Sequence, residues 1–185
     1  RLFSIFVFNI EIDEIEYAYC FDGPYDPEKG LLFDKERFIL DPYARAVAAQ
    51  SVWGKKMDDA QFYKARVVHN DFDWGDERSP HIKMQDLIIY ELHVRNFTID
   101  PSSGVKHPGT FEGIREKIPY LADRGINCVE LMPVFEFNEM HNAREVDGRQ
   151  LYECWGYNST CFFAPNTVYA TTDEYNHEGN EIKRL

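Results

Sequence analysis

The sequence predicts a small, mainly β domain followed by the start of an α/β domain. Up to about Val68, short runs of aromatic and β-branched residues alternate with clusters of Gly, Pro and Asp, a pattern typical of short strands joined by turns. From Asp86 onward, an apolar run, an amphipathic stretch and a second apolar run follow one another within about fifty residues, as in a βαβ unit. Both runs are near-continuously apolar and of strand length, so we expect parallel strands covered on both faces.

The N-terminal part carries strand and turn patterns in succession. Its predicted strands are "LFSIFVFNI" (2–10), "IEYAYCF" (15–21) and "QFYKARVV" (61–68). Between the first and the last of them, "DGPYDPEKG" (22–30) has Pro and Gly spaced as turns require. In "LDPYARAVA" (40–48), Asp41 as N-cap and Pro42 at the first helical position predict a short helix. The polar, unpatterned stretch "NDFDWGDERSPH" (70–81) predicts a linker.

The second half predicts strand, helix and strand. The strands are "DLIIYELHV" (86–94) and "INCVELMPV" (126–134). Thr110 is the expected N-cap of the helix between them, which ends at Gly125 and contains a proline, Pro119, that predicts a kink or an altered start. One face of this helix is apolar and is formed by Phe111, Ile114, Ile118 and Leu121. Another helix is expected in "EYNHEGNEIKRL", residues 174–185.

A long loop is expected between Pro133 and about Pro165. Its last part, "YECWGYNSTCFFAP" (152–165), has five aromatic residues and two cysteines around a single glycine. The apolar residues follow neither the helical nor the strand period, and several residues are breakers. A loop this aromatic either packs beneath its own domain or offers ring faces to a flat ligand. In βα-repeat folds, the segment that leaves the C-terminal end of a strand is where sites are built.

Charge and composition exclude several classes of partner. The formal net charge of −12 argues against binding to nucleic acid or to an anionic membrane surface. No apolar run approaches the roughly 20 residues of a spanning helix. The four cysteines are widely scattered and predict reduced thiols, and the histidines show no metal-binding spacing, so we expect no metal and no cofactor. Without an initiator Met or a signal-peptide layout, Arg1 is expected to lie inside a longer sequence.

Four blocks of sequence, in this order, are similar to the isoamylase-type debranching enzymes of the α-amylase superfamily. They are "GPYDPEKGLLFDKERFILDPYARAV", "DLIIYELHVRNFT", "PGTFEGIREKIPYLADRGINCVELMPVFEFNE" and "WGYNSTCFFAP". The resemblance implies that residues 1–75 form a β-sandwich module of the carbohydrate-binding type, incomplete at its start. It also implies that residues 80–185 begin a catalytic (β/α)8 TIM barrel, with the two apolar strands as its first two strands.

The resemblance implies a glycoside hydrolase that cleaves α-1,6-glucosidic branch linkages by the retaining mechanism. Its partners would be branched α-glucans such as amylopectin, glycogen and limit dextrin, and other isoamylase subunits in a homo- or hetero-oligomer. The family's catalytic carboxylates lie on barrel strands beyond Leu185, so this chain has no catalytic residue and is expected to be inactive alone. The alternatives are a non-catalytic regulatory or glucan-binding subunit of the same fold, and, with less support, a glucan-branching transferase. A plant or algal protein would be in the plastid stroma and a bacterial one in the cytoplasm.

The same resemblance answers what the aromatic segment does. It implies that Tyr157 stacks on the glucose ring beside the cleaved bond, which suits the C–H face of a sugar. Trp155 either lines the cleft or braces the loop. Phe162 and Phe163 are expected in the core. Within the stretch from Phe135 to Glu153 that precedes them, Asn142 and Arg144 are open to contact with glucan, although a solvated surface is the expected role.

Other candidate residues are expected to be structural. Glu130, a charge inside an apolar strand, is expected to have Arg95 or His93 as its partner, since these share one side of the preceding strand with Glu91. Four aromatic residues of the N-terminal part are either glucan platforms or, as expected here, packing residues: Tyr25, Trp53, Phe72 and Trp74. Asn96 and Cys161 depart from the usual family pattern, which carries a small residue and Asn there.

Overall fold

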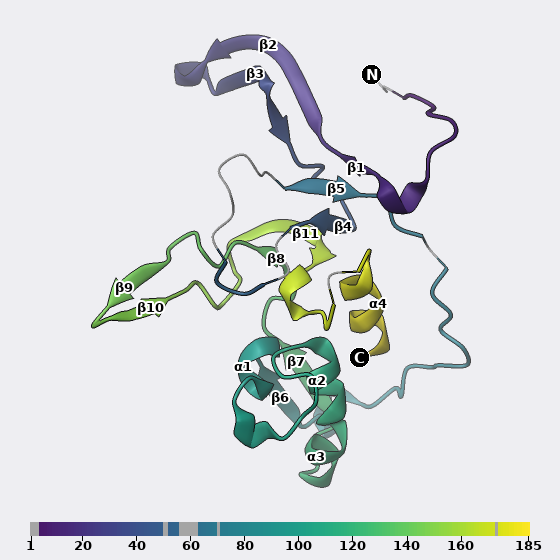
Figure 1. Cartoon of the computed structure of the whole chain (residues 1–185). Coiled ribbons are helices and arrows are strands. Elements are labelled where there is room, and N and C mark those ends of the chain that lie inside the picture. Colours follow the sequence, from purple (N-terminus) through teal and green to yellow (C-terminus); the bar gives the residue numbers. More distant parts are fainter. Residues whose placement is uncertain (1–3, 50–51, 56–62, 70, 173) are drawn as a thin grey trace.

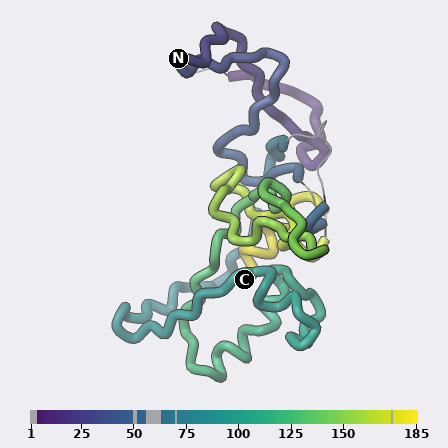
Figure 2. The backbone as a smooth tube through the Cα atoms, turned by 90° about the vertical axis from the view of Figure 1, so that its left-hand side faces the viewer, coloured from purple at the N-terminus to yellow at the C-terminus, as the bar shows by residue number. Residues whose placement is uncertain are grey.

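The computed structural model describes residues 4–49, 52–55, 63–69, 71–172 and 174–185. Figure 1 shows a long β-hairpin at one end, a middle layer of short strands with the helix α4 (His177–Arg184), and the βαβ unit at the other end. Figure 2, turned by 90°, shows the same order along the molecule. The middle layer combines the two halves of the sequence, because β11 (Ser159–Pro165) contacts β4 (Ala46–Ala48).

The N-terminal part is β-rich, as predicted, with different bounds. A three-stranded antiparallel sheet has the order β1 (Glu16–Tyr17), β5 (Lys64–Arg66) and β4 (Ala46–Ala48). The strand predicted at 2–10 is wrong over the described residues 4–10, which form no strand and leave Ile5, Phe6 and Phe8 exposed. A strand needs a neighbour for its backbone hydrogen bonds, and β1 pairs with β5 instead. Residues 61–62 of the third predicted strand lie outside the described residues.

The long hairpin is formed by β2 (Tyr19–Asp26) and β3 (Leu31–Ile39). The turn predicted at 22–30 is therefore wrong in its first half, since strand pairing continues to Asp26 opposite Leu31. The short 3-10 helix Pro27–Lys29 makes the turn. Across the pair, the ring of Phe33 covers Gly23, whose absent side chain leaves it room.

The short helix predicted at 40–48 is wrong. Only one turn forms, where the Tyr43 and Ala44 N–H groups donate to Asp41 Oδ1 (2.9 Å) and Asp41 O (3.1 Å). The chain then enters β4, because Ala46 and Val47 are fully buried and pair with β5. Burial in a sheet has here overridden local helix signals.

The βαβ unit is confirmed. Strands β6 (Ile89–Leu92) and β7 (Cys128–Leu131) pair in parallel. Thr110 caps the helix between them by accepting from the Gly113 N–H (3.1 Å), and Pro119 divides it into α2 (Phe111–Glu116) and α3 (Ile118–Asp123). Coverage of both faces is not observed, since Ile89 and Tyr90 are exposed. Ile118, expected on the apolar face, is also exposed.

The long loop predicted after Pro133 contains four strands. β8 (Phe135–Phe137) pairs antiparallel with β11 (Ser159–Pro165), and β9 (Arg144–Val146) pairs with β10 (Arg149–Leu151). Two register shifts interrupt β11, so its side chains do not follow a period of two and the pattern conceals the strand. The helix expected at the end of the chain is confirmed as α4 (His177–Arg184).

Two buried clusters hold these elements together. The larger contains Leu92, Val94, Phe111, Ile114, Leu121, Phe137 and Tyr169. The smaller joins both halves of the sequence through Ala44, Val47, Ala65, Cys161 and Ala164.

The remaining helices are short: Ile12–Glu14, Met84–Asp86, α1 (Val94–Thr98), Pro101–Ser103 and Thr167–Tyr169. Residues 71–81 form no helix or strand, consistent with the predicted linker. All four cysteines are free thiols, as expected. No described helix is long and apolar enough to cross a bilayer.

Candidate functional site

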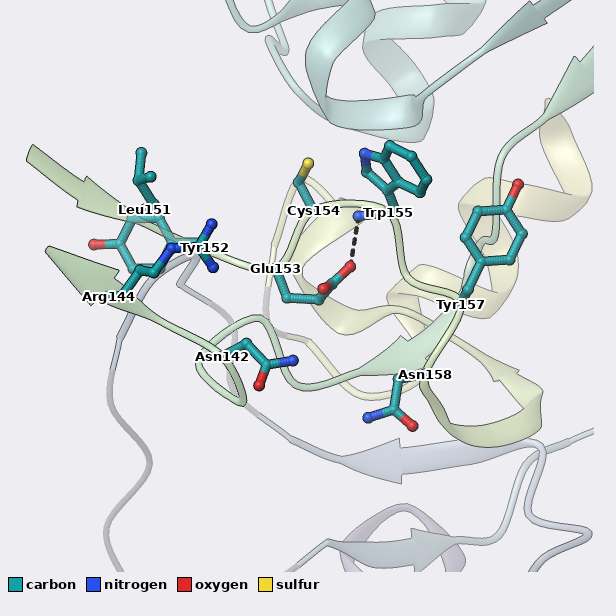
Figure 3. Close-up of a pocket in the computed structure, with 9 residues that line it drawn as sticks. All are labelled: Asn142, Arg144, Leu151, Tyr152, Glu153, Cys154, Trp155, Tyr157 and Asn158. Carbon is teal, nitrogen blue, oxygen red and sulfur yellow. Dashed lines mark hydrogen bonds between the residues drawn. The ribbon is translucent and has the colours of Figure 1, made fainter. Parts of the chain in front are cut away.

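A pocket of about 650 Å³ lies between the β9–β10 hairpin and the aromatic segment, within the ~300–1,000 Å³ range of ligand pockets. It is lined by Asn142, Arg144, Leu151, Tyr152, Glu153, Cys154, Trp155, Tyr157 and Asn158. Figure 3 shows Arg144 and Leu151 on one side and Trp155 and Tyr157 on the other, with Glu153 and Cys154 between them. The sequence-predicted site residues Tyr157 and Trp155 are thus together, and Asn142 and Arg144 share their pocket.

Backbone hydrogen bonds fix the loop that carries the two aromatic rings. The Glu153 carboxylate accepts from the N–H groups of Trp155 (3.0 Å) and Gly156 (3.4 Å), and the first of these bonds is drawn in Figure 3. Gly156 has φ +77°, and a Cβ there would lie 3.0 Å from the ring of Phe137. Only glycine suits both the conformation and the space. The loop is therefore held close against the core while its side chains face outward.

The rings of Trp155 and Tyr157 are available to a ligand. Each residue is 64% exposed, and the ring centroids lie 6.3 Å apart with planes at 73°. By contrast, the expectation that Phe162 and Phe163 are core residues is wrong, because they are 61% and 56% exposed. In β11 the inward positions belong to Cys161 and Ala164, which are buried. Figure 3 draws neither phenylalanine in the pocket, and neither lines it.

His93 supports the loop through a hydrogen bond to the loop backbone. Its Nδ1 accepts from the Asn96 N–H (3.1 Å), so Nε2 carries the proton and donates to the Cys154 carbonyl. The Tyr169 hydroxyl lies 3.3 Å from Nε2. Burial lowers the pKa of His93, and the nearby Arg95 lowers it further, which favours the neutral ring that this arrangement needs.

A segment of the N-terminal part braces the pocket wall. Trp53 stacks on Tyr169 (centroids 6.5 Å apart, 15° between planes) and meets Tyr152 edge-on at 6.4 Å. The Arg95 guanidinium lies 4.7 Å from the centre of the Trp53 ring. Gly54 donates to Glu139 Oε1 (2.8 Å). Trp53 is thus a packing residue, as expected.

The other N-terminal aromatic residues lie outside this pocket. Tyr25 and Trp74 are 69% and 55% exposed, and neither lines it. Phe72 packs edge-on against Trp74 at 4.9 Å and has the Lys183 ammonium 5.4 Å above its ring.

The predicted partner of Glu130 is wrong. Glu130 is exposed, lies opposite Glu91 in the parallel pair, and forms no ion pair with His93 or Arg95 within the described residues. His93 turns instead to Cys154, and Arg95 stacks on Trp53. The strand presents Glu130 to solvent, so it needs no buried cation.

Four buried glutamates were missed by the sequence analysis: Glu136, Glu139, Glu178 and Glu181. Glu136 Oε2 accepts from the Thr167 N–H (2.9 Å), while burial, with the charges of Glu139 and Glu178, raises the pKa of Glu136 to about 8. The sequence signal that could have indicated Glu136 is its position between two aromatic residues in "FEF" (135–137). No group of three or more His, Cys, Asp or Glu side chains in the described part is arranged to hold a metal ion.

The comparisons with known proteins agree on one family. The chain is 35% identical over 182 residues to chloroplastic isoamylase 1 of Arabidopsis thaliana, covering 95% of this chain and 23% of that protein. It is 36% identical over 176 residues to chloroplastic isoamylase 3 of rice, Oryza sativa subsp. japonica, covering 92% of this chain and 22% of that protein. The chain belongs to the isoamylase-type debranching family. This isoamylase-type chain spans less than a quarter of the length of these two relatives.

Bacterial relatives and solved structures extend the likeness. A glycogen operon protein GlgX homologue of Mycobacterium tuberculosis is 31% identical over 191 residues, covering 91% of the isoamylase-type chain and 26% of that protein. A type I pullulanase of Bacillus subtilis, solved with maltose, superposes with a TM-score of 0.61 at 25% identity, over 90% of this chain and 22% of that one. A pullulanase of Anoxybacillus, solved with maltotriose, gives a TM-score of 0.58 at 30% identity, over 80% of this chain and 21% of that one. No family model matches the chain.

Proposed function

We propose that the complete protein containing this chain hydrolyses α-1,6-glucosidic branch linkages in starch- or glycogen-type glucans, with retention of configuration. The observation that carries the proposal is the exposed pair Trp155 and Tyr157 in a pocket of about 650 Å³, in a chain similar to plant isoamylases. An exposed ring can cover the C–H face of glucose with little loss of side-chain entropy. Tyr157 is the proposed platform for the reacting sugar, and Trp155 lines the same cleft.

The chain supplies substrate binding and not the reacting carboxylates. Retaining hydrolysis requires a nucleophile and an acid/base about 5 to 5.5 Å apart. No carboxylate of this chain is proposed for either role. Glu153, the acid that lines the pocket, holds the loop backbone, and the buried Glu136 accepts from the Thr167 N–H. Residues 80–185 are proposed to begin a (β/α)8 barrel and residues 1–75 to form a β-sandwich module. For a plant or algal source, plastid localisation is proposed by likeness to the chloroplastic relatives, and for a bacterial source the cytoplasm.

The first test replaces the platform in the complete protein. Tyr157→Ala is expected to reduce the turnover of a branched glucan at saturating substrate by about 100-fold, because misplacing the reacting sugar disturbs the transition state. Release of linear chains from glycogen measures this. Tyr25→Ala, an exposed aromatic outside the pocket, is the control and should act like the unchanged protein. Equal turnover by the Tyr157 variant would exclude the platform role, and absence of α-1,6 cleavage by the unchanged protein would exclude the hydrolase.

A further inference from the structure

The β9–β10 hairpin presents Arg144 to the pocket in a fixed register. Asp147 and Gly148 both have positive φ (51° and 72°), which is the two-residue turn that matches the twist of a hairpin. The register places Arg144 opposite Leu151. Directly opposed residues share a face of the pair, and both residues line the pocket. Glu145 and Gln150, the next opposed pair, lie on the other face by the alternation of strands.

Arg144 has donors to offer a ligand. Its side chain is exposed, and no carboxylate of the described residues lies within 4.0 Å of its guanidinium nitrogens. The pocket also contains Asn142 and Asn158, and its one acid, Glu153, is occupied with the loop backbone. A guanidinium with five donors, two amides and two ring faces suits a neutral ligand with many hydroxyl groups. An anion is disfavoured, because Glu153 lies in the same pocket and the chain carries a net charge of −12.

The pocket offers two separate points of attachment for one sugar chain, Arg144 and the aromatic pair. Figure 3 shows Arg144 and Tyr157 at opposite sides, with Glu153 and Cys154 between them. A ring stacked on Tyr157 therefore leaves Arg144 to a different glucosyl unit. We propose that Arg144 is a specificity-determining residue, which binds a glucosyl unit of the glucan other than the one on Tyr157 and makes affinity depend on chain length. This inference rests on the proposed function and adds the role of the hairpin to it.

The test compares Arg144→Ala with Arg149→Ala in the complete protein. Arg149 is the matched control, because it lies in the same hairpin, carries the same charge and does not line the pocket. Substrates are branched oligosaccharides whose chains are lengthened by one glucose at a time. For the longer chains, Arg144→Ala is expected to raise KM about 10-fold, the loss of one hydrogen bond from a charged donor. With the shortest chains KM is expected within about 2-fold, and kcat unchanged.

The outcomes separate the two proposals. Equal KM values for Arg144→Ala and the unchanged protein at every chain length, or an equal rise in Arg149→Ala, would overturn the role of Arg144 and leave the debranching function standing. If the unchanged protein does not cleave branches, the binding of maltohexaose, measured by calorimetry, still tests the role of Arg144. A Kd raised about 10-fold by Arg144→Ala alone supports Arg144. No binding by the unchanged protein, or equal Kd values for it and Arg144→Ala, overturns the role.

Discussion

At the scale of single residues, burial decides which acidic side chains affect the stability of the fold. Glu130 and Glu136 look alike in sequence, each an acid among apolar neighbours, yet Glu130 faces solvent and Glu136 is fully buried. Burial favours the neutral acid, and the nearby Glu139 and Glu178 add to the effect, so the pKa of Glu136 is raised to about 8 from 4.5. Between pH 4.5 and about 8, the folded protein therefore binds a proton at Glu136 that the unfolded chain releases.

This linkage predicts a loss of stability with rising pH. Because the folded pKa of Glu136 lies above the unfolded value, its contribution is complete below pH 4.5 and is lost as the pH rises through about 8. The free energy of unfolding should fall by about 1 kcal/mol per pH unit between pH 6.5 and 8. The lowered pKa of His93 has the opposite effect, since it makes stability rise with pH, but this effect is nearly complete by about pH 7.5 because unfolded histidine titrates at about 6.5. Urea unfolding at pH values half a unit apart measures the slope of the free energy of unfolding against pH.

Glu136→Gln is the variant that isolates this residue. Its side-chain oxygen can still accept from Thr167, and it has no proton to lose. We expect a shallower slope and greater stability at pH 8.5 than in the unchanged protein. Glu130→Gln, at an exposed position, serves as the control and should keep the original slope. A Glu136→Gln slope as steep as the original would assign the pH dependence to other groups, of which the buried Glu178 also has a raised pKa.

At the scale of elements, local signals predicted the βαβ unit and failed where long-range pairing decides. Thr110 and Pro119 act through neighbouring backbone, so the start of α2 and the break before α3 follow from sequence. The candidate site residue Tyr157 was predicted from a resemblance; it is exposed, and its role in binding stays a prediction. The place of Arg144 in the pocket depends on the register of the β9–β10 hairpin. The burial of Ala46 depends on its pairing with β5, a strand that lies about twenty residues away in the sequence and that the residues around Ala46 do not indicate.

The aromatic loop gives a prediction at this scale. Gly156→Ala places a Cβ 3.0 Å from the Phe137 ring and 3.3 Å from Pro133 Cβ, at φ +77°. We expect a loss of about 1–2 kcal/mol in the free energy of unfolding and displacement of Trp155 and Tyr157. Binding of maltohexaose should weaken by about 10-fold or more. Gly104→Ala is the control, since it has φ +67° with open space around it. Should both variants bind equally well, contact with the core does not position the loop.

At the scale of the whole molecule, the two halves of the sequence share their buried clusters. Trp53 from the first half packs against the larger cluster, and Ala44, Val47 and Ala65 pack with Cys161 and Ala164 from the second. The proposed boundary between residues 75 and 80 thus separates two modules in sequence whose packed residues remain in contact. Removing one half uncovers apolar surface on the other.

Residues 80–185 expressed alone are therefore expected to lose cooperative unfolding. Without the first half, Phe137 and Tyr169 lose the Trp53 ring, and Cys161 and Ala164 lose the residues that cover them. Strands β6 and β7 already expose Ile89, Tyr90 and Val129, and apolar strands with open edges recruit other chains. The expected result is low solubility, binding of a hydrophobic dye and rapid amide exchange in both strands, measured beside the complete protein. A soluble, monomeric fragment with a cooperative transition would contradict this, because it would make residues 80–185 a domain that needs neither Trp53 nor the further strands of the proposed barrel.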